Sequence, residues 1–136
     1  MKKIALSLFV AVLSIICLTG CEKKPADMII GKFKLVDIST DRPIPPDELE
    51  FYQENNAELI SSSWDEFNKD SSLVSCANGV VKKGMWQLLG DGKQLKYTYE
   101  GNSTVIKEVF SLTDSELITT EKDNEGYTTT LKYTKE

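Results

Sequence analysis

The sequence predicts an all-β domain of antiparallel strands that follows a short N-terminal apolar segment. Apolar and polar residues alternate in several places, as in Gln94–Glu100, where Leu95, Tyr97 and Tyr99 would share one face. Turn residues recur about every eight to twelve residues through the second half of the chain. After the N-terminal segment, no stretch indicates a helix longer than two turns. This pattern is typical of an antiparallel barrel or sandwich.

The first twenty residues have the organisation of a secretion signal. Lys2 and Lys3 form a short basic start, and Ile4–Leu18 is apolar apart from two serines. As a helix, this apolar run would span about 22 Å at ~1.5 Å per residue, which is less than the ~30 Å core of a bilayer. A cleaved leader is therefore favoured over a membrane-spanning anchor.

The end of the leader, Leu18-Thr19-Gly20-Cys21, resembles the lipobox of bacterial lipoproteins. That resemblance implies a signal peptide over 1–20, cleavage between Gly20 and Cys21, and acyl chains such as palmitate on Cys21. Two or three acyl chains give stable membrane attachment, which a single chain does not. We therefore expect a lipoprotein anchored in the bacterial cell envelope, on the outer membrane where the cell has one.

Charge and composition exclude several classes of function. Removing the leader from the 136-residue chain leaves 116 residues, and loss of its two lysines changes the net charge from −5 to −7. Such an acidic domain is a poor partner for nucleic acid. The chain has no histidine, which excludes Ser-His-Asp catalysis and His-based zinc sites. No nucleotide-binding or nucleophile motif is present either. We expect no enzyme activity, no cofactor and no metal.

The expected elements follow in chain order. Residues 21–27 are charged and interrupted by Pro25, and they indicate a tether to a domain over 28–136. Three prolines within 40–47 indicate a stiff loop. The pair Asn55-Asn56 indicates a tight hairpin, and 62–78 is ambiguous between a short helical turn and a loop. About eight strands are expected from the alternating or β-branched segments, which are 29–39, 49–53, 57–61, 79–89, 94–100, 103–112, 116–121 and 127–134. The ambiguous stretch could also contain a strand near 73–76.

Short motifs in this pattern resemble small bacterial lipocalin-like lipoproteins. Gly31-Lys32-Phe33 resembles the Gly-x-Trp opening of lipocalins, and Gly84-Met85-Trp86 is a second Gly-x-aromatic motif. The segments 90–95 and 131–134 are also similar to that group. The resemblance implies an up-and-down barrel that binds a small apolar or amphipathic ligand, or none. It also implies that Phe33 plugs the closed end of the barrel beneath a basic side chain.

The side chains expected to line the barrel are mostly aromatic and lie on the inward faces of the predicted strands. They are Phe33, Trp86, Leu95, Tyr97, Tyr99, Phe110, Tyr127, Leu131 and Tyr133. Such faces can surround a ligand cavity or fill a solid core. Glu108 falls on the apolar face of its strand, so it would point inward unless a bulge offsets the register.

Three functional hypotheses are compatible with these residues. The first is a lipid-anchored protein that binds a small hydrophobic ligand in its barrel. The second is a structural envelope lipoprotein that acts through protein contacts, with an unknown partner. The third is an inhibitor that presents a loop over 64–70, where Trp64 and Phe67 accompany a solvated group of acids. The remaining thiol, Cys76, is either a partly buried apolar residue or a reactive group.

Overall fold

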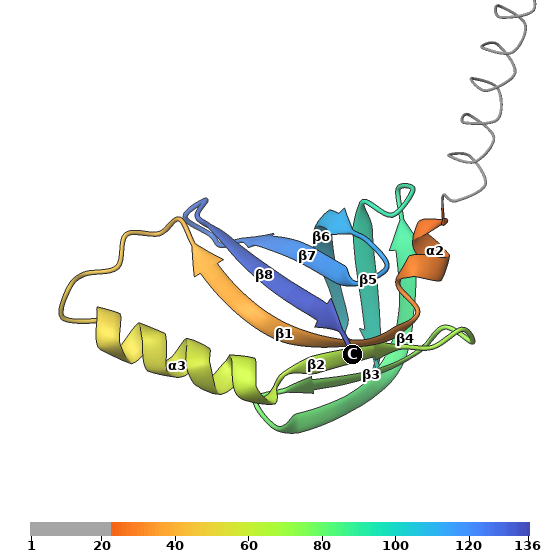
Figure 1. Ribbon diagram of the computed structural model, residues 1–136, viewed down its shortest axis with the longest axis horizontal. Coiled ribbons are helices and arrows are strands. Elements are labelled where there is room, and N and C mark those ends of the chain that lie inside the picture. The colour runs from red at the N-terminus through yellow and green to blue at the C-terminus, as the bar shows by residue number, and fades with distance from the viewer. Residues whose placement is uncertain (1–22) are drawn as a thin grey trace, which may run out of the picture.

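The computed structural model describes residues 23–136, and these form a closed antiparallel barrel of eight strands (Figure 1). Each strand pairs with its neighbours in sequence, and β8 closes on β1. The predicted all-β fold is therefore confirmed, whereas the predicted signal peptide and Cys21 lie outside the described residues. The elements are α2 (Pro25–Met28), β1 (Gly31–Thr40), α3 (Leu49–Ser62), β2 (Trp64–Phe67), β3 (Ser72–Ala77), β4 (Val80–Leu89), β5 (Gln94–Tyr99), β6 (Thr104–Leu112), β7 (Glu116–Lys122) and β8 (Thr128–Lys135).

One end of the barrel is closed by the segment that enters β1. Phe33 is fully buried there, with the ammonium of Lys135 5.2 Å from the centre of its ring. Lys135 also donates a hydrogen bond of 2.8 Å to the carbonyl of Met28. Gly31 gives the lysine room, because a Cβ on that residue would lie 3.2 Å from the Lys135 side chain. The expected plug beneath a basic side chain is therefore confirmed, with phenylalanine in the place of tryptophan.

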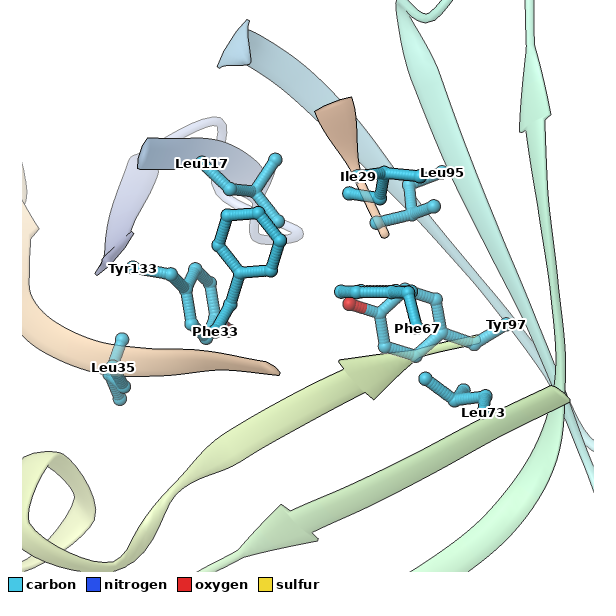
Figure 2. Close-up of a cluster of buried hydrophobic side chains, with 9 residues drawn as sticks. All are labelled: Ile29, Phe33, Leu35, Phe67, Leu73, Leu95, Tyr97, Leu117 and Tyr133. Carbon is cyan, nitrogen blue, oxygen red and sulfur yellow. The ribbon is translucent and has the colours of Figure 1, made fainter. Parts of the chain in front are cut away.

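The apolar core occupies this closed end and the middle of the barrel. Figure 2 shows nine buried side chains that point toward one another from strands around the barrel and from the segment after α2. Phe67 lies among three aromatic rings, with edge-to-face contacts to Phe33, Trp86 and Tyr97 at centroid distances of 5.8–6.0 Å. The cluster consists of Ile29, Phe33, Leu35, Phe67, Leu73, Leu95, Tyr97, Leu117 and Tyr133.

The second Gly-x-aromatic motif marks a close approach of two backbones. A Cβ on Gly84 would collide with the carbonyl group of Thr98 on β5, so no larger residue fits there without a shift. Two residues later, the indole of Trp86 donates a 2.9 Å hydrogen bond to the carbonyl of Asn68. The motif therefore fixes β4 to β5 and to the turn between β2 and β3.

The expected hairpin over 49–61 is wrong, because these residues form the 14-residue helix α3. The half-buried residues of the helix fall at Tyr52, Asn56, Leu59 and Ile60, which is a helical spacing. This period outweighs the turn preference of the Asn55-Asn56 pair. The helix packs on β1 and β3, and Figure 1 shows it at the opposite end of the molecule from α2.

The ambiguous region 62–78 contains strand β2, which the sequence analysis did not predict. Asp65 and Phe67 point inward and are at most 4% exposed, whereas Trp64 points outward beneath the ammonium of Lys32, 4.2 Å from its ring centre. The acids at 65–70 are therefore not one solvated loop. The inhibitor hypothesis loses its basis, because the loop that it needs is a paired strand.

Strand β6 differs from the prediction because of a bulge between Val109 and Ser111. Before the bulge, the inward positions are Lys107 and Val109 rather than Ile106 and Glu108. Glu108 is exposed and accepts a hydrogen bond from Gln94, which agrees with the bulge alternative. Phe110 points outward and is 76% exposed, so its assignment to the barrel lining is wrong.

Candidate functional site

The open end of the barrel, the mouth, carries a groove of about 710 Å³ between α3, the loop over 41–48 and the ends of β1 and β8. Ile38 and Leu131 pair across the two strands and supply its apolar floor. Leu59 and Phe51 face them from α3. Phe51 is 69% exposed, so a large aromatic side chain remains uncovered in the groove.

The rim of the groove is held by Arg42. Its guanidinium donates hydrogen bonds to Asp123 at 2.9 Å and to Glu125 at 3.1 Å, and it lies 5.2 Å from the ring centre of Tyr127. The pKa of Asp123 is lowered: desolvation is the largest single effect and acts to raise it, but the backbone N–H groups of the turn and Arg42 together outweigh it. These contacts fasten the loop after β1 to the turn between β7 and β8.

A layer of buried polar groups lies one step deeper than the groove. Asp65 is 4% exposed and accepts hydrogen bonds from the hydroxyls of Ser75 and Tyr97, the second at 2.8 Å. On the other side of the barrel, Lys107 donates a 3.3 Å hydrogen bond to the hydroxyl of Tyr133. We call Asp65, Ser75, Tyr97, Lys107 and Tyr133 the polar layer.

The ionisable groups in and beside the polar layer stabilise the charged form of Lys107. Burial by itself lowers the pKa of Lys107, but Tyr133, Asp65 and Glu121 outweigh it and raise that pKa above its usual value. The carboxylate of Glu121 lies 3.9 Å from the Lys107 ammonium at the mouth side. Lys107 therefore stays charged although only 13% of its side chain is exposed.

Burial lowers the pKa of a lysine, but it raises the pKa of the two phenols in the polar layer. It raises the pKa of Tyr133 to about 12, although Lys107 partly offsets this effect. Burial and the adjacent Asp65 raise the pKa of Tyr97 well above its usual value of 10.0. Both hydroxyls therefore remain protonated and act as hydrogen-bonding groups near neutral pH.

One group beside this layer is left without a partner. Within residues 23–136, the hydroxyl of Thr119 is fully buried and makes no hydrogen bond to the protein. Thr119 points inward from β7, directly opposite Val109 on β6. A buried hydroxyl without a partner costs about 1–3 kcal/mol. At the level of the polar layer, the barrel interior therefore contains a polar group that the packing of the apolar core does not need.

The structure places the predicted lining residues in three environments. Phe33, Leu95, Tyr97 and Tyr133 fill the core, with Trp86 packed against it. Tyr99 and Leu131 lie half-buried nearer the mouth. Tyr127 precedes β8 and is half-buried under Arg42, and Phe110 lies on the outer surface. The aromatic faces thus fill the closed end and the middle of the barrel instead of surrounding a cavity there.

Sequence reasoning missed the most distinctive residues of the site. The sequence pattern does not identify Asp65 and Lys107 as inward-facing residues, because charged side chains usually face water. Phe51 and Leu59 fall in the predicted strands 49–53 and 57–61, whereas both lie in α3. The signal that could have found the groove is the helical spacing of the apolar residues over 52–60.

Cys76 behaves as a small buried residue. It is 7% exposed, makes no disulfide within 23–136, and points its thiol at the carbonyl of Ser62, 3.3 Å away. The helix end covers it from solvent. This agrees with the interpretation of Cys76 as a packing residue.

Fold and groove define a small closed antiparallel barrel with a helix across its mouth. The chain is similar in structure to a DUF4847 family protein from Bacteroides vulgatus, with a TM-score of 0.54 and 10% sequence identity over 79% of this chain and 93% of that one. At this identity the likeness shows the fold alone. No family model and no curated protein matches the sequence. Among residues 23–136, no helix has the length and apolar character needed to cross a membrane.

Proposed function

We propose that this protein is a lipid-anchored envelope protein that binds a small amphipathic molecule in the mouth groove. The observation that carries the proposal is the groove itself. Its volume of about 710 Å³ lies within the range of roughly 300–1,000 Å³ usual for small-molecule sites. Its apolar floor and the uncovered ring of Phe51 provide surface that a hydrocarbon chain would cover.

The charges at the rim argue for a neutral or cationic head group. Asp47, Glu48 and Asp123 line the groove, against a single cation, Arg42. The guanidinium of Arg42 is already paired with Asp123 and Glu125. An anionic head group would therefore meet uncompensated carboxylates.

Calorimetric titration of the soluble domain, residues 22–136, tests ligand binding. The probes are dodecyl maltoside, dodecyltrimethylammonium and dodecyl sulfate, each below its micelle concentration. We expect saturable binding of the first two and weaker binding of the sulfate. Phe51→Ser should weaken binding about tenfold, because the loss of one buried aromatic contact costs on the order of 1.5 kcal/mol. Phe110→Ser, at an exposed phenylalanine outside the groove, is the matched control. Absence of saturable binding, or equal effects of the two substitutions, would contradict the proposal.

The membrane anchor rests on the sequence around Cys21. The Cys21→Ser chain should incorporate no radiolabelled palmitate and should keep its leader. A mature form of this variant that still fractionates with membranes would overturn the anchor.

The filled core favours a second candidate, a structural envelope lipoprotein without a ligand. Phe33, Leu95, Tyr97 and Tyr133 leave little room in the closed end and the middle of the barrel, as a scaffold would require. Outer-face apolar residues such as Ile106 and Met85 are about half exposed and are available for protein contacts. Stoichiometric recovery of a partner from detergent-solubilised envelopes, together with no binding in the titrations above, would favour this function.

A further inference from the structure

We infer that the closed end of the barrel lies flat against the membrane, with Phe110 in the interfacial layer of the lipid and the mouth groove facing away from it. The inference rests on the proposed lipid anchor at Cys21. Its evidence comes from the chain just after that residue and from the outer surface of the closed end.

Only a short stretch of chain separates the anchor from the barrel. The ammonium of Lys23 lies 3.1 Å from the carboxylate of Asp114, which is in the turn between β6 and β7. Two residues of chain reach at most about 7 Å. Acyl chains on Cys21 would therefore hold this turn within one or two side-chain lengths of the lipid surface.

The chain after Lys23 is packed on the barrel. A Cβ on Gly92 would lie 2.8 Å from Pro25, so α2 sits directly on the turn between β4 and β5. Ile29, the residue after α2, is fully buried in the core. The predicted tether over 21–27 is thus partly wrong: from Pro25 onward it is a short helix fixed to the closed end (Figure 1).

Phe110 is an exposed aromatic residue near the end of β6. The bulge of β6 turns this ring outward, where it is 76% exposed. The neighbouring Val109 donates a 2.8 Å backbone hydrogen bond to Lys93, at the turn on which α2 packs. Phe110 is therefore beside the anchored turns, and an aromatic ring at this position is suited to the interface between lipid and water.

Charge does not supply this contact. The lysines beside these two turns are offset by acids: Lys23, Lys24 and Lys93 are accompanied by Asp27, Asp91 and Asp114. The mature chain is also acidic overall. Anionic lipid would give little attraction. The anchor and the aromatic ring must therefore hold the closed end of the barrel against the membrane. This orientation should not depend on the anionic lipid content.

The consequence concerns access to the groove. Helix α3 lies at the other end of the molecule from α2 (Figure 1). The groove is lined by residues of α3, so it lies at that end as well. In the proposed orientation, a ligand would exchange with the aqueous phase and not directly with the bilayer.

The test uses the lipidated full protein carrying Cys76→Ala and Phe110→Cys, labelled with bimane and reconstituted in phosphatidylcholine vesicles that contain doxyl lipid. The control label is at Asn124→Cys, in the exposed turn between β7 and β8 at the mouth. We expect several-fold stronger quenching at position 110 than at 124, unchanged when anionic lipid is added. A second measurement needs no substitution: hydrogen exchange of the lipidated protein in nanodiscs should be slower at 90–93 and 110–115 than in the soluble domain, and unchanged at 123–126.

Flotation with the vesicles distinguishes failure of the proposed anchor from failure of the proposed orientation. Protein that does not float overturns the anchor and, with it, the orientation. Protein that floats but shows equal quenching at 110 and 124, or equal exchange in the two states, overturns the orientation and leaves the anchor standing.

Discussion

The two halves of this barrel are built differently. In the closed half, Phe33, Phe67 and Leu95 are fully buried, and the rings pack edge to face. In the mouth half, the inward side chains include Asp65 and Lys107, and an exposed phenylalanine, Phe51, faces a groove. The closed half therefore contributes apolar packing, and the mouth half adds buried polar groups and an uncovered aromatic ring, which apolar packing alone does not require.

The largest expected effect is a difference in the free energy of unfolding between two phenylalanine substitutions, one in each half of the barrel. Phe67→Ala removes a fully buried ring with three aromatic neighbours and should lower the free energy of unfolding by about 3–5 kcal/mol. Phe51→Ala, in the groove, should change it by at most about 0.5 kcal/mol. Urea unfolding followed by circular dichroism measures both. Similar losses for the two variants would remove the distinction.

The second largest effect is expected from a substitution in the polar layer. Asp65→Ala leaves the hydroxyls of Tyr97 and Ser75 without their acceptor and removes a negative charge near Lys107. We expect a loss of about 2–4 kcal/mol in the free energy of unfolding. Glu66→Ala, at the adjacent outward position, is the control and should cost about 0.5 kcal/mol or less. An equally small effect of Asp65→Ala would show that the layer is not a stabilising network.

The same layer predicts a loss of stability at alkaline pH. Folding raises the pKa of Tyr133 from 10.0 to about 12, and the pKa of Tyr97 and Lys107 rises as well. A raised pKa contributes stability that is complete below the unfolded value and is lost as the pH rises through the folded value. The free energy of unfolding should fall by on the order of 2 kcal/mol between pH 10 and 12, and by less in Tyr133→Phe. Urea midpoints across this range, with phenolate absorbance at 295 nm, provide the measurement. A flat profile is the contrary result.

The smallest effect concerns the hydroxyl of Thr119. Thr119→Val replaces a buried group that lacks a partner within 23–136 by a methyl group of similar shape. The variant should be more stable by about 1 kcal/mol, measured as a rise in the thermal midpoint. A destabilised variant would mean that this hydroxyl is satisfied by a bound water or ligand, and the polar character of the mouth half would then extend to Thr119.

The difference between the halves also decides what the sequence could predict. Leu95, Tyr97 and Tyr99 alternate with polar residues, so β5 and the strand order around it were predictable. Strand β2 was not, because its inward positions hold an acid and an aromatic ring, Asp65 and Phe67, and the alternation does not identify a buried face. In β6, one bulged residue reverses the inward set, which places Lys107 inside and Phe110 outside. A single sequence does not mark such a bulge.

Helix α3 was not predicted from the sequence, for a different reason. The Asn55-Asn56 pair is a strong local turn signal, and it masked the helical spacing of Tyr52, Asn56 and Leu59. Because the groove exists only between this helix and the mouth, the candidate site could not be predicted once the helix was missed. The plug at Phe33 was predictable, since a short motif carries it.

The most direct test of the account is a nuclear magnetic resonance titration of the isotope-labelled soluble domain with dodecyl maltoside below its micelle concentration. The account predicts saturable shift changes at Phe51, Leu59 and Leu131, around the groove, and none at Phe67 or Leu95 in the closed half. Saturable changes centred on the closed half, or no saturable change at all, would contradict the proposal that the mouth half is the binding half.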